Sequence, residues 1–324
     1  MNDGQRHLIA TIARQYYFED KSKSELANAF GLSRFKIARL LEQAREEGIV
    51  TIEINEGDAY RSALAAELAH HLHLLECVVI RAGDTDEENR RLLARAAAAH
   101  ITSQVHEGDV LGFSWGRTLV AIGAQLEELP PSTILQLTGT VGNDFAQSPV
   151  EVIRRIAGRS KVETMAIFSP LFAASEEAAH SLRSDPAIQR AMALYSDLAL
   201  AVLSIGSWDP PISQLFTMLN TEDHEELARE GAKAEMAGIF LRQDGSLIEA
   251  ALAKRRISVS ASELLATPRV LAVAGSAEKV GAIAAVARSG LVTSLITDDK
   301  TAAMLKQLPA VKNHVLERQN RTAR

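Results

Sequence analysis

Four short segments of the chain combine glycine with hydroxyl, amide or basic groups, and each follows a run of apolar residues. Segments of this kind can bind a small polar ligand, because their backbone amides are accessible and their side chains form hydrogen bonds. Two of the four precede helical patterns, and each of these two holds one basic residue, Arg117 or Lys279. The four segments are Ser114-Trp115-Gly116-Arg117-Thr118, Thr138-Gly139-Thr140-Val141-Gly142, Gly206-Ser207-Trp208 and Gly275-Ser276-Ala277-Glu278-Lys279.

The chemistry that these segments favour is the binding of a polyhydroxylated metabolite that carries an anionic group. Their hydroxyls suit the hydroxyls of a sugar, whereas Arg117 and Lys279 suit a phosphate or a carboxylate. The glycine spacing fits neither the P-loop nor the dinucleotide fingerprint. We therefore expect a small-molecule effector site without a cofactor.

A second candidate site lies in residues 33–41, which contain Arg34, Lys36 and Arg39 and no acidic residue. The whole chain has a net charge of −6, which argues against indiscriminate binding of nucleic acid. A local basic helix on an acidic protein is typical of a sequence-specific DNA reader, and such a helix fits the major groove. The residues that we expect to contact double-stranded DNA are Ser33, Arg34, Phe35, Lys36 and Arg39.

The elements around this basic helix predict a winged helix-turn-helix domain over residues 1–55. An amphipathic helix is expected over 5–18, and a capping box of Ser22 and Glu25 starts a short helix that ends before Gly31. The basic helix then runs from Ser33 to about residue 47, and residues 49–54 alternate like a strand. A small helical bundle with a solvated basic face is the alternative.

The remaining residues predict a linker helix over 56–75 and an α/β effector domain over 76–316. Short apolar runs alternate with helical patterns, which indicates a largely parallel sheet covered by helices. Ligands bind beyond the carboxyl ends of such strands, so the four glycine-containing segments should meet at one edge. The expected strands are 76–81, 109–113, 133–138, 163–168, 198–205, 236–241, 270–274 and 291–296. The expected helices include 86–106, 117–128, 149–157, 185–195, 222–230 and 277–288.

Composition restricts the class of protein. The 324 residues are 47% hydrophobic and 23% charged, which suits about two domains with sizeable cores. A single cysteine, Cys77, excludes a disulfide framework and a cysteine-rich zinc site. His70, His71 and His73 point to different faces of a helix, so no metal is expected. Neither a signal peptide nor a membrane-length apolar run is recognisable, and we expect a cytoplasmic protein without a membrane partner.

Segments along nearly the whole chain resemble the SorC/DeoR-type sugar-binding transcriptional regulators. The resemblance includes the helix-turn-helix and is most specific near the C-terminus. The matching segments are SKSELANAFGLSRFKIARLLEQAREEGIV at 22–50, GFSWGRTL at 112–119, LTGTVG at 137–142, SDPAIQRAM at 184–192, DLALAVLSIGS at 197–207 and VAGSAEKVGAIAAVARSGLVTSLITDD at 273–299.

This resemblance implies a DNA-binding homodimer or homotetramer that is controlled by a phosphorylated sugar or related polyol. It also implies an effector domain related to the ribose-phosphate isomerase and glucosamine-phosphate deaminase fold. Together with the segments above, it leads us to expect operator DNA as a partner. The expected effector-binding residues are Gly112, Ser114, Trp115, Gly116, Arg117, Thr118, Thr138, Gly139, Thr140, Gly142, Gly206, Ser207, Glu235, Gly275 and Lys279.

Three positions depart from the family's usual pattern. Ser276 stands where a second glycine is common, and Ala234-Glu235 stands where Gly-Asp is common. The aspartate that is often found near Arg242 is replaced by a base. These changes bear on the charge or shape of the ligand, so an uncharged sugar alcohol remains an alternative to a phosphate ester.

The alternative function is a sugar-phosphate isomerase or deaminase-like enzyme. Lys279 could then act as a Schiff-base or general-base lysine, with Glu235 or Glu278 as its acid partner. Fold does not determine function, however, and an enzyme would have no use for the helix-turn-helix. We therefore predict a regulator and not an enzyme. A DNA-binding protein without a ligand is a third reading, and it leaves the glycine-containing segments unexplained.

Overall fold

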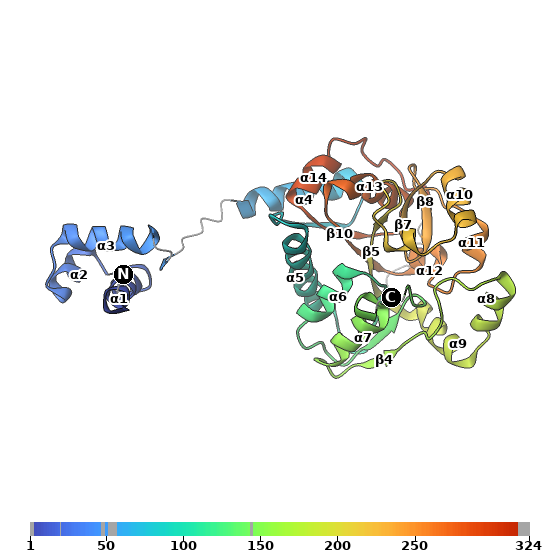
Figure 1. The fold of residues 1–324 in the computed structure, drawn as a ribbon, viewed down its shortest axis with the longest axis horizontal. Helices are drawn as coiled ribbons and strands as arrows, with labels where there is room; N and C mark the ends of the chain where they lie inside the picture. The colour runs from blue at the N-terminus through green and yellow to red at the C-terminus, as the bar shows by residue number, and fades with distance from the viewer. Residues whose placement is uncertain (1–2, 20, 47–48, 51–56, 143–144, 317–324) are drawn as a thin grey trace. The chain divides into compact units, whose positions relative to one another are not determined.

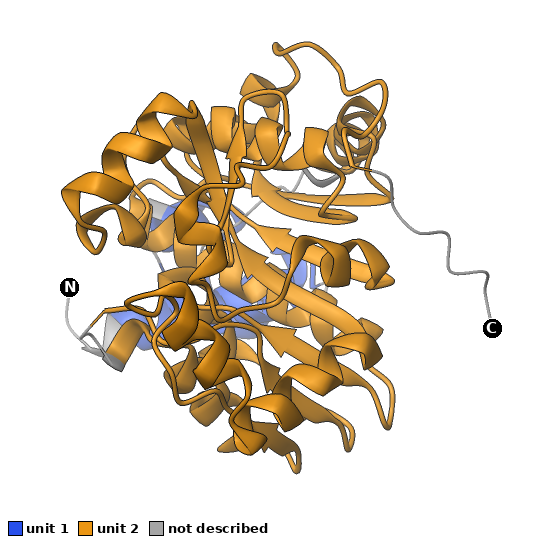
Figure 2. Cartoon of the chain, turned by 90° about the vertical axis from the view of Figure 1, so that its right-hand side faces the viewer, with its two compact units in different colours: residues 1–56 blue, residues 57–324 orange. Residues whose placement is uncertain are grey.

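The computed structural model describes residues 3–19, 21–46, 49–50, 57–142 and 145–316, and it divides the chain into two compact units (Figures 1 and 2). The smaller unit spans residues 1–56 and the larger one residues 57–324. The boundary falls next to the linker that the sequence predicts after residue 55.

The smaller unit contains the three predicted helices, α1 (Asp3–Tyr17), α2 (Lys23–Phe30) and α3 (Arg34–Glu46). The capping box at the start of α2 is confirmed: Ser22 accepts a hydrogen bond from the Glu25 amide, and the Glu25 carboxylate accepts one from the Ser22 amide. Gly31 ends α2 with a φ of +64°, a left-handed conformation that glycine adopts without strain. The sequence therefore determines the bounds of this turn locally.

One apolar core holds these three helices together. Ile9 and Ile12 of α1, Leu26 of α2, and Ile37 and Leu40 of α3 are buried in it. Residues 49–50 form a bend, and residues 51–54 of the predicted strand lie outside the described residues. The wing therefore stays a prediction.

The larger unit is built on a seven-stranded sheet with the order β1-β10-β9-β5-β2-β3-β4, in which every neighbouring pair is parallel. This confirms the predicted parallel sheet, although the last strand begins three residues later than expected. The strands are β1 (Glu76–Ile80), β2 (Val110–Phe113), β3 (Thr133–Gln136), β4 (Glu163–Met165), β5 (Leu198–Ser204), β9 (Arg269–Val273) and β10 (Ser294–Asp298).

Helices cover both faces of this sheet (Figure 2). Strand β5 shows why: Leu200 and Val202 point into one core cluster, whereas Ala201 and Leu203 point into the other. Both faces of a parallel strand are thus buried, as its continuous apolar sequence requires. One face is covered by α5 (Asp86–Gln104), α6 (Arg117–Gln125) and α7 (Pro149–Ala157), and the other by α4 (Gly57–Leu72), α13 (Val280–Ser289) and α14 (Asp299–Leu305).

Helix α4 belongs to the larger unit. Its residues Leu64, Leu68 and Leu72 are buried, and the helix packs against β1 and α14. The segment predicted as a linker helix therefore packs on the sheet through its own apolar face.

The predicted strand over residues 236–241 is wrong. These residues belong to a hairpin in a separate antiparallel sheet of β6 (Gly206–Ser207), β7 (Ala232–Met236) and β8 (Ile239–Arg242). Ala237 and Gly238, both with positive φ, form the turn between β7 and β8. A two-residue turn of that kind matches the twist of a hairpin. The turn was not predicted because apolar residues flank it on both sides, so the two strands resemble one continuous strand.

Shorter helices complete the larger unit, and α8, α11, α12 and α14 are not among the helices named from the sequence. In the part of the chain that the structure describes, no helix is long and apolar enough to cross a membrane. The remaining helices are α8 (Glu176–Arg183), α9 (Pro186–Ala193), α10 (Thr221–Arg229), α11 (Ala251–Lys254) and α12 (Ala261–Ala266), with short 3₁₀ turns η1 (Phe145–Gln147), η2 (Leu194–Asp197), η3 (Gln214–Thr217) and η4 (Ala277–Lys279).

Candidate functional site

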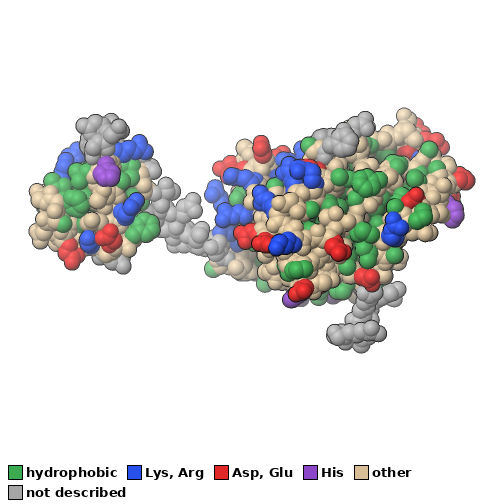
Figure 3. Space-filling view, turned by 90° about the horizontal axis from the view of Figure 1, so that it is seen from below, with side chains coloured by type: hydrophobic (Ala, Val, Ile, Leu, Met, Phe, Trp, Pro, Cys, Tyr) green, Lys and Arg blue, Asp and Glu red, His purple; other side chains and the backbone are tan. Residues whose placement is uncertain are grey.

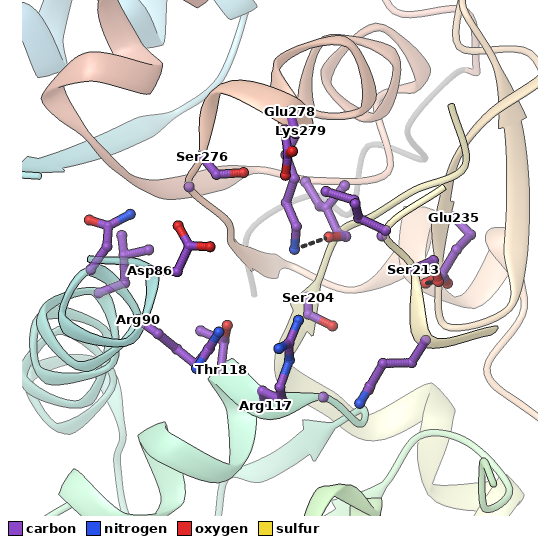
Figure 4. A pocket seen from close by; sticks show the side chains of 18 of the residues that line it. Asp86, Arg90, Arg117, Thr118, Ser204, Ser213, Glu235, Ser276, Glu278 and Lys279 are labelled. Carbon is purple, nitrogen blue, oxygen red and sulfur yellow. Dashed lines mark hydrogen bonds between the residues drawn. The ribbon is translucent and has the colours of Figure 1, made fainter. Parts of the chain in front are cut away.

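A cavity of about 270 Å³ lies beyond the carboxyl ends of β2, β5 and β9 (Figure 4). The N-terminal part of α5 forms one wall, and residues next to the β6–β8 sheet form another. This is the edge at which α/β sheets bind ligands. The lining residues are Asp86, Asn89, Arg90, Leu93, Trp115, Gly116, Arg117, Thr118, Ser204, Ile205, Gly206, Ile212, Ser213, Gln214, Glu235, Gly275, Ser276, Glu278 and Lys279.

The loop after β2 brings Arg117 to the cavity. Gly116 is the N-cap of α6 and has a φ of +126°, and no side chain caps the helix there. The Ser204 hydroxyl donates to the Trp115 carbonyl, which ties this loop to the end of β5. The first amides of α6 therefore face the cavity without a capping side chain, as in a helix N-terminus that binds an anion.

The loop after β9 has the same backbone conformation at a residue that is not glycine. Ser276 has a φ of +136° and precedes η4 and α13, and its amide donates to the Thr301 hydroxyl. A side chain at Gly275 would overlap the Asp298 carboxylate, so only glycine fits there. Ser276 thus adopts a conformation that residues with a side chain rarely adopt, and its backbone is strained.

Lys279 extends from this loop into the cavity. Its Nζ atom donates a hydrogen bond of 2.8 Å to the Ile205 carbonyl. Burial lowers the pKa of Lys279 to about 8, against the opposing attraction of Glu235, and Arg117 and Arg90 lower it further. Lys279 is therefore a cation in a site that already holds positive charge.

Glu235 lines the cavity and is only 4% exposed. Its Oε1 atom accepts a 2.7 Å hydrogen bond from Ser213, whereas Oε2 has no hydrogen-bond partner among the described residues. Burial raises the pKa of Glu235 to about 6, although the Ser213 hydroxyl and Lys279 act to lower it. A Cβ at Gly206 would overlap Oε1, so that glycine makes room for the carboxylate. The Glu235 carboxylate is therefore a buried hydrogen-bond acceptor in the lining of the cavity.

Arg90 and Arg117 face the cavity from α5 and α6 (Figure 4). Burial and the charge of Arg117 lower the pKa of Arg90, and Asp86 and Glu87 oppose this effect. Neither guanidinium forms an ion pair with a residue that the structure describes. Two like charges without a direct counter-ion favour the binding of an anion between them.

Asn89 fixes the wall from which Arg90 projects. Its side chain donates to Asp298 and accepts from the Gly83 amide, both within 3.1 Å. Asp298 is buried and also accepts from the amide and the hydroxyl of Thr301. This network joins the start of α5 to the carboxyl end of β10.

A second hollow of about 590 Å³ adjoins the cavity and shares Arg90 and Arg117 with it. Arg91, Arg155, Glu87 and Glu88 also line it, so it adds basic and acidic groups in similar number. Basic side chains gather at one end of the larger unit in the view of Figure 3.

The helix α3 presents the second candidate site. Ile37, Leu40, Leu41 and Ala44 are buried on its inner face. The Ser33 hydroxyl accepts a hydrogen bond from the Lys36 amide and thereby caps the helix. The residues predicted to contact DNA, Ser33, Arg34, Phe35, Lys36 and Arg39, are all exposed.

Comparison with known proteins decides the family. Residues 60–306 match the family described as "Putative sugar-binding domain". The erythritol catabolism regulatory protein EryD of Brucella abortus is 30% identical over 94% of this chain and 98% of its own. This chain belongs to the SorC/DeoR-type family of sugar-binding transcriptional regulators.

Other members of the SorC/DeoR-type family agree along nearly the whole length. The sorbitol operon regulator of Klebsiella pneumoniae is 24% identical over 94% of this chain and 99% of its own. The crystal structure of full-length SorC from Klebsiella pneumoniae covers 94% of this chain and 99% of its own, with a TM-score of 0.77 and 22% identity. The predicted family and the coarse α/β architecture are thus confirmed.

The cavity of this SorC/DeoR-type chain contains eight of the effector-binding residues expected from the sequence. They come from the loops after β2, β5 and β9 and from strand β7. These residues are Trp115, Gly116, Arg117, Thr118, Gly206, Glu235, Gly275 and Lys279.

The loop after β3 does not line the cavity, contrary to the prediction that four loops share it. The Thr140 hydroxyl donates to the Ser169 carbonyl, Gly139 packs on the Pro170 backbone, and Thr138 pairs with Ser258. These contacts hold the loop against neighbouring segments of the chain. Gly112 packs between Leu137 and Leu198 in the core. The residues left outside the cavity are Gly112, Ser114, Thr138, Gly139, Thr140, Gly142 and Ser207.

The residues that sequence reasoning missed come from α5 and from the segment after β6. Asp86, Asn89 and Arg90 lie at the start of α5, directly after the loop that follows β1. That loop holds a single glycine, Gly83, and is not one of the four glycine-containing segments expected at the site. Ser213 and Gln214 follow the cavity's β5 loop and carried no distinct signal.

His71, His73 and Cys77 contact other parts of the larger unit. His71 Nε2 lies 3.0 Å from the Leu308 carbonyl, and the His73 ring packs edge-on against His314. Burial raises the pKa of the Cys77 thiol to about 12, which keeps it protonated. Within the described residues, no group of three potential ligands could hold a metal ion.

Proposed function

We propose that the cavity binds a monophosphorylated sugar or polyol, and that this ligand controls the binding of the regulator to operator DNA. The observation that carries the proposal is the contrast between the two ends of the cavity. Arg90 and Arg117 face one end without an ion pair among the described residues. Glu235 and Ser213, which are joined by a hydrogen bond, line the other end. A phosphate suits the first end and neutral hydroxyls suit the second.

A single phosphate fits this arrangement better than one at each end of the ligand. Above its pKa of about 6, Glu235 is ionised and would repel a second phosphate. The carboxylate instead accepts a hydrogen bond from a hydroxyl. Lys279 lies between the two ends in Figure 4, with donors left after its bond to Ile205.

The relatives suggest which molecules to test first. EryD is named for erythritol catabolism, and SorC for a sorbitol operon. We therefore propose erythritol, sorbitol and their monophosphate esters as the first ligand panel. Each offers a chain of neutral hydroxyls, with or without one terminal phosphate.

Isothermal titration calorimetry with this panel tests the proposal. We expect one ester to bind at least about tenfold more tightly than its free polyol, because charge-assisted hydrogen bonds contribute about 1.5–3 kcal/mol each. Arg90→Gln and Arg117→Gln should remove most of this preference. Arg95→Gln, on the exposed face of α5, is the matched control and should keep it. Equal binding of ester and polyol, with normal binding by both variants, would assign the cavity to an uncharged sugar alcohol.

We also propose that the bound ligand is not converted. Lys279 donates to the Ile205 carbonyl, a contact that suits a binding group as well as a catalytic one. The relatives are named as regulators. Incubation of the protein with the sugar-phosphate forms of the ligand, followed by NMR, separates the two functions. Saturable thermal stabilisation without turnover supports the regulator. Turnover would support an isomerase or deaminase.

The DNA-binding form is proposed to be a homodimer or homotetramer in the cytoplasm. One helix-turn-helix contacts few base pairs, so pairs of them bind pseudo-palindromic sites. The exposed residues of α3 would enter the major groove, and the Ser33 hydroxyl would donate to a phosphate. Light scattering of the protein alone and on duplex DNA measures the assembly. A monomer under both conditions would contradict it.

A further inference from the structure

Phe35 is the most exposed of the large apolar side chains in the described residues, with 90% of its surface accessible. It lies in the first turn of α3 (Figure 1), directly after Arg34. The buried residues of α3 begin with Ile37, so Phe35 takes no part in the core of its unit. An apolar ring in that position gains no stability for the folded chain, and its burial requires a partner.

The groups around Phe35 restrict what that partner is. Arg34, Lys36 and Arg39 are exposed on the same helix, and none of them forms an ion pair with a described residue. The partner must therefore be anionic overall and must offer an apolar group beside its charges. Duplex DNA meets both conditions. In its major groove, the 5-methyl group of thymine is the one apolar group that a base pair presents.

We propose that Phe35 packs on the 5-methyl group of a thymine and determines the base preference at that position of the operator. This inference rests on the proposed role of α3 as the recognition helix. Residues at the N-terminal end of such a helix reach base edges. Contacts between cations and the phosphates position such a helix but carry no sequence information. Phe35 therefore distinguishes an A·T pair from others by an apolar contact.

The size of the effect follows from the area that one methyl group buries. Removing a buried methyl group weakens binding about fourfold, which corresponds to about 0.8 kcal/mol. Deoxyuridine lacks only this methyl group and keeps the hydrogen-bonding edge of thymine. Replacement of thymine by deoxyuridine thus isolates the contact from the rest of the readout.

The test is a double-mutant cycle between protein and DNA. Full-length protein first selects duplexes from a pool of random 20-base-pair sequences. Each thymine of the selected duplex is then replaced singly by deoxyuridine, and fluorescence anisotropy gives the Kd for wild type, Phe35→Leu and Phe35→Ala. We expect one thymine in each half-site at which deoxyuridine weakens wild type about fourfold. The same replacement should leave Phe35→Ala unaffected, and Phe35→Leu should respond in between.

The controls separate this inference from the proposed function. If Arg34→Ala and Arg39→Ala bind the selected duplex normally, or no sequence is selected, α3 is not the recognition helix and both proposals fail. If these variants bind weakly but no thymine couples to Phe35, only the present inference is overturned. A changed oligomeric state of Phe35→Ala, with uniform weakening on all duplexes, would assign the ring to a protein contact and also overturn it.

Discussion

The Nζ atom of Lys279 lies 2.8 Å from the carbonyl oxygen of Ile205, to which it donates a hydrogen bond. This bond joins the loop after β9 to the end of β5, two strands that are neighbours in the sheet. It holds the ammonium group in the cavity that Glu235 lines from a different sheet. The charge at the centre of the site is therefore placed by the backbone and not by an ion pair.

The pKa values of Glu235 and Lys279 predict how ligand affinity depends on pH. Glu235 has a raised pKa of about 6 and Lys279 a lowered pKa of about 8, so both are charged between these values. Affinity for a phosphate ester should be highest in this window. It should fall below pH 6 as Glu235 becomes protonated, and above pH 8 as Lys279 becomes neutral. Calorimetry from pH 5 to pH 9 measures the profile.

Glu235→Gln separates the protein's titration from that of the ligand. A phosphate monoester has a second pKa of about 6, so part of the acid limb belongs to it. In the variant, only this part should remain. The alkaline limb should shift to lower pH, because Lys279 loses the attraction of Glu235 that raises its pKa. An identical acid limb in wild type and variant would show that Glu235 does not titrate in contact with the ligand.

The same pKa values predict the pH dependence of stability. Glu235 is raised from 4.5, so its contribution is present below pH 4.5 and is lost as pH rises through about 6. Lys279 is lowered from 10.5, so its contribution is present above pH 10.5 and is lost as pH falls through about 8. Both effects disfavour the ligand-free fold between pH 6 and 8. Glu235→Gln should flatten the loss between pH 4.5 and 6 in urea unfolding, and an unchanged slope would contradict the assignment.

Gly206→Ala should remove ligand binding and leave the fold intact. The new Cβ would overlap Glu235 Oε1, and the carboxylate would have to leave its hydrogen bond with Ser213. We expect a loss of ligand affinity of about tenfold or more, since one charged hydrogen bond contributes about 1.5–3 kcal/mol. Gly281→Ala is the matched control, because the nearest atom to its Cβ is 3.9 Å away. Equal affinity in both variants would count against the placement of Glu235.

Ser276→Gly should stabilise the protein. The φ of +136° costs a residue with a side chain about 1–3 kcal/mol, and glycine avoids this cost. The greater freedom of glycine in the unfolded chain offsets about 0.5–1 kcal/mol of the gain. Urea unfolding should give a free energy of unfolding about 1 kcal/mol higher. Ser184→Gly, at an ordinary φ of −85°, should instead lower it. A destabilised Ser276→Gly variant would show that the serine side chain compensates for its conformation.

Arg34→Ala should weaken specific DNA binding by about 1–3 kcal/mol if the guanidinium reads a guanine. The reason is the exposed position of Arg34 at the first residue of α3. Arg45→Ala removes the same charge from the last turn of that helix and should act weakly. Competition binding on a selected duplex and on a random one distinguishes lost specificity from lost charge. Unchanged affinity in all variants of Arg34, Lys36 and Arg39 would reject the interface.

Local sequence signals predicted the elements of the fold well. The capping box at Ser22 and the glycine at residue 31 act within one turn, so α2 could be placed without tertiary information. The parallel strands β2, β5 and β9 were recognisable from continuous apolar runs of the correct length. The hairpin of β7 and β8 was not, because its turn uses Ala237 in a conformation that alanine rarely adopts.

Topology predicted the parts of the site that follow directly from a strand end of the parallel sheet. Arg117 and Lys279 each open a helix after a strand of one sheet, so topology brings them together. Arg90 comes from a helix whose position depends on the tertiary bond of Asn89 to Asp298, 209 residues away. Thr138 and Thr140 also follow a strand, but other segments cover them. Packing between distant segments therefore decides which strand ends reach the ligand.

We propose that a phosphate ester bound by Arg90 and Arg117 controls operator binding. The most direct measurement is the titration of a complex between full-length protein and its selected duplex with a monophosphate ester, followed by fluorescence anisotropy. The ester should change the affinity of wild type for DNA, and the same ester should have little effect on Arg90→Gln/Arg117→Gln, whose ligand-free affinity for DNA should match wild type. An equal response of wild type and the double variant, or no response of wild type to any ester that calorimetry shows to bind, would contradict the claim.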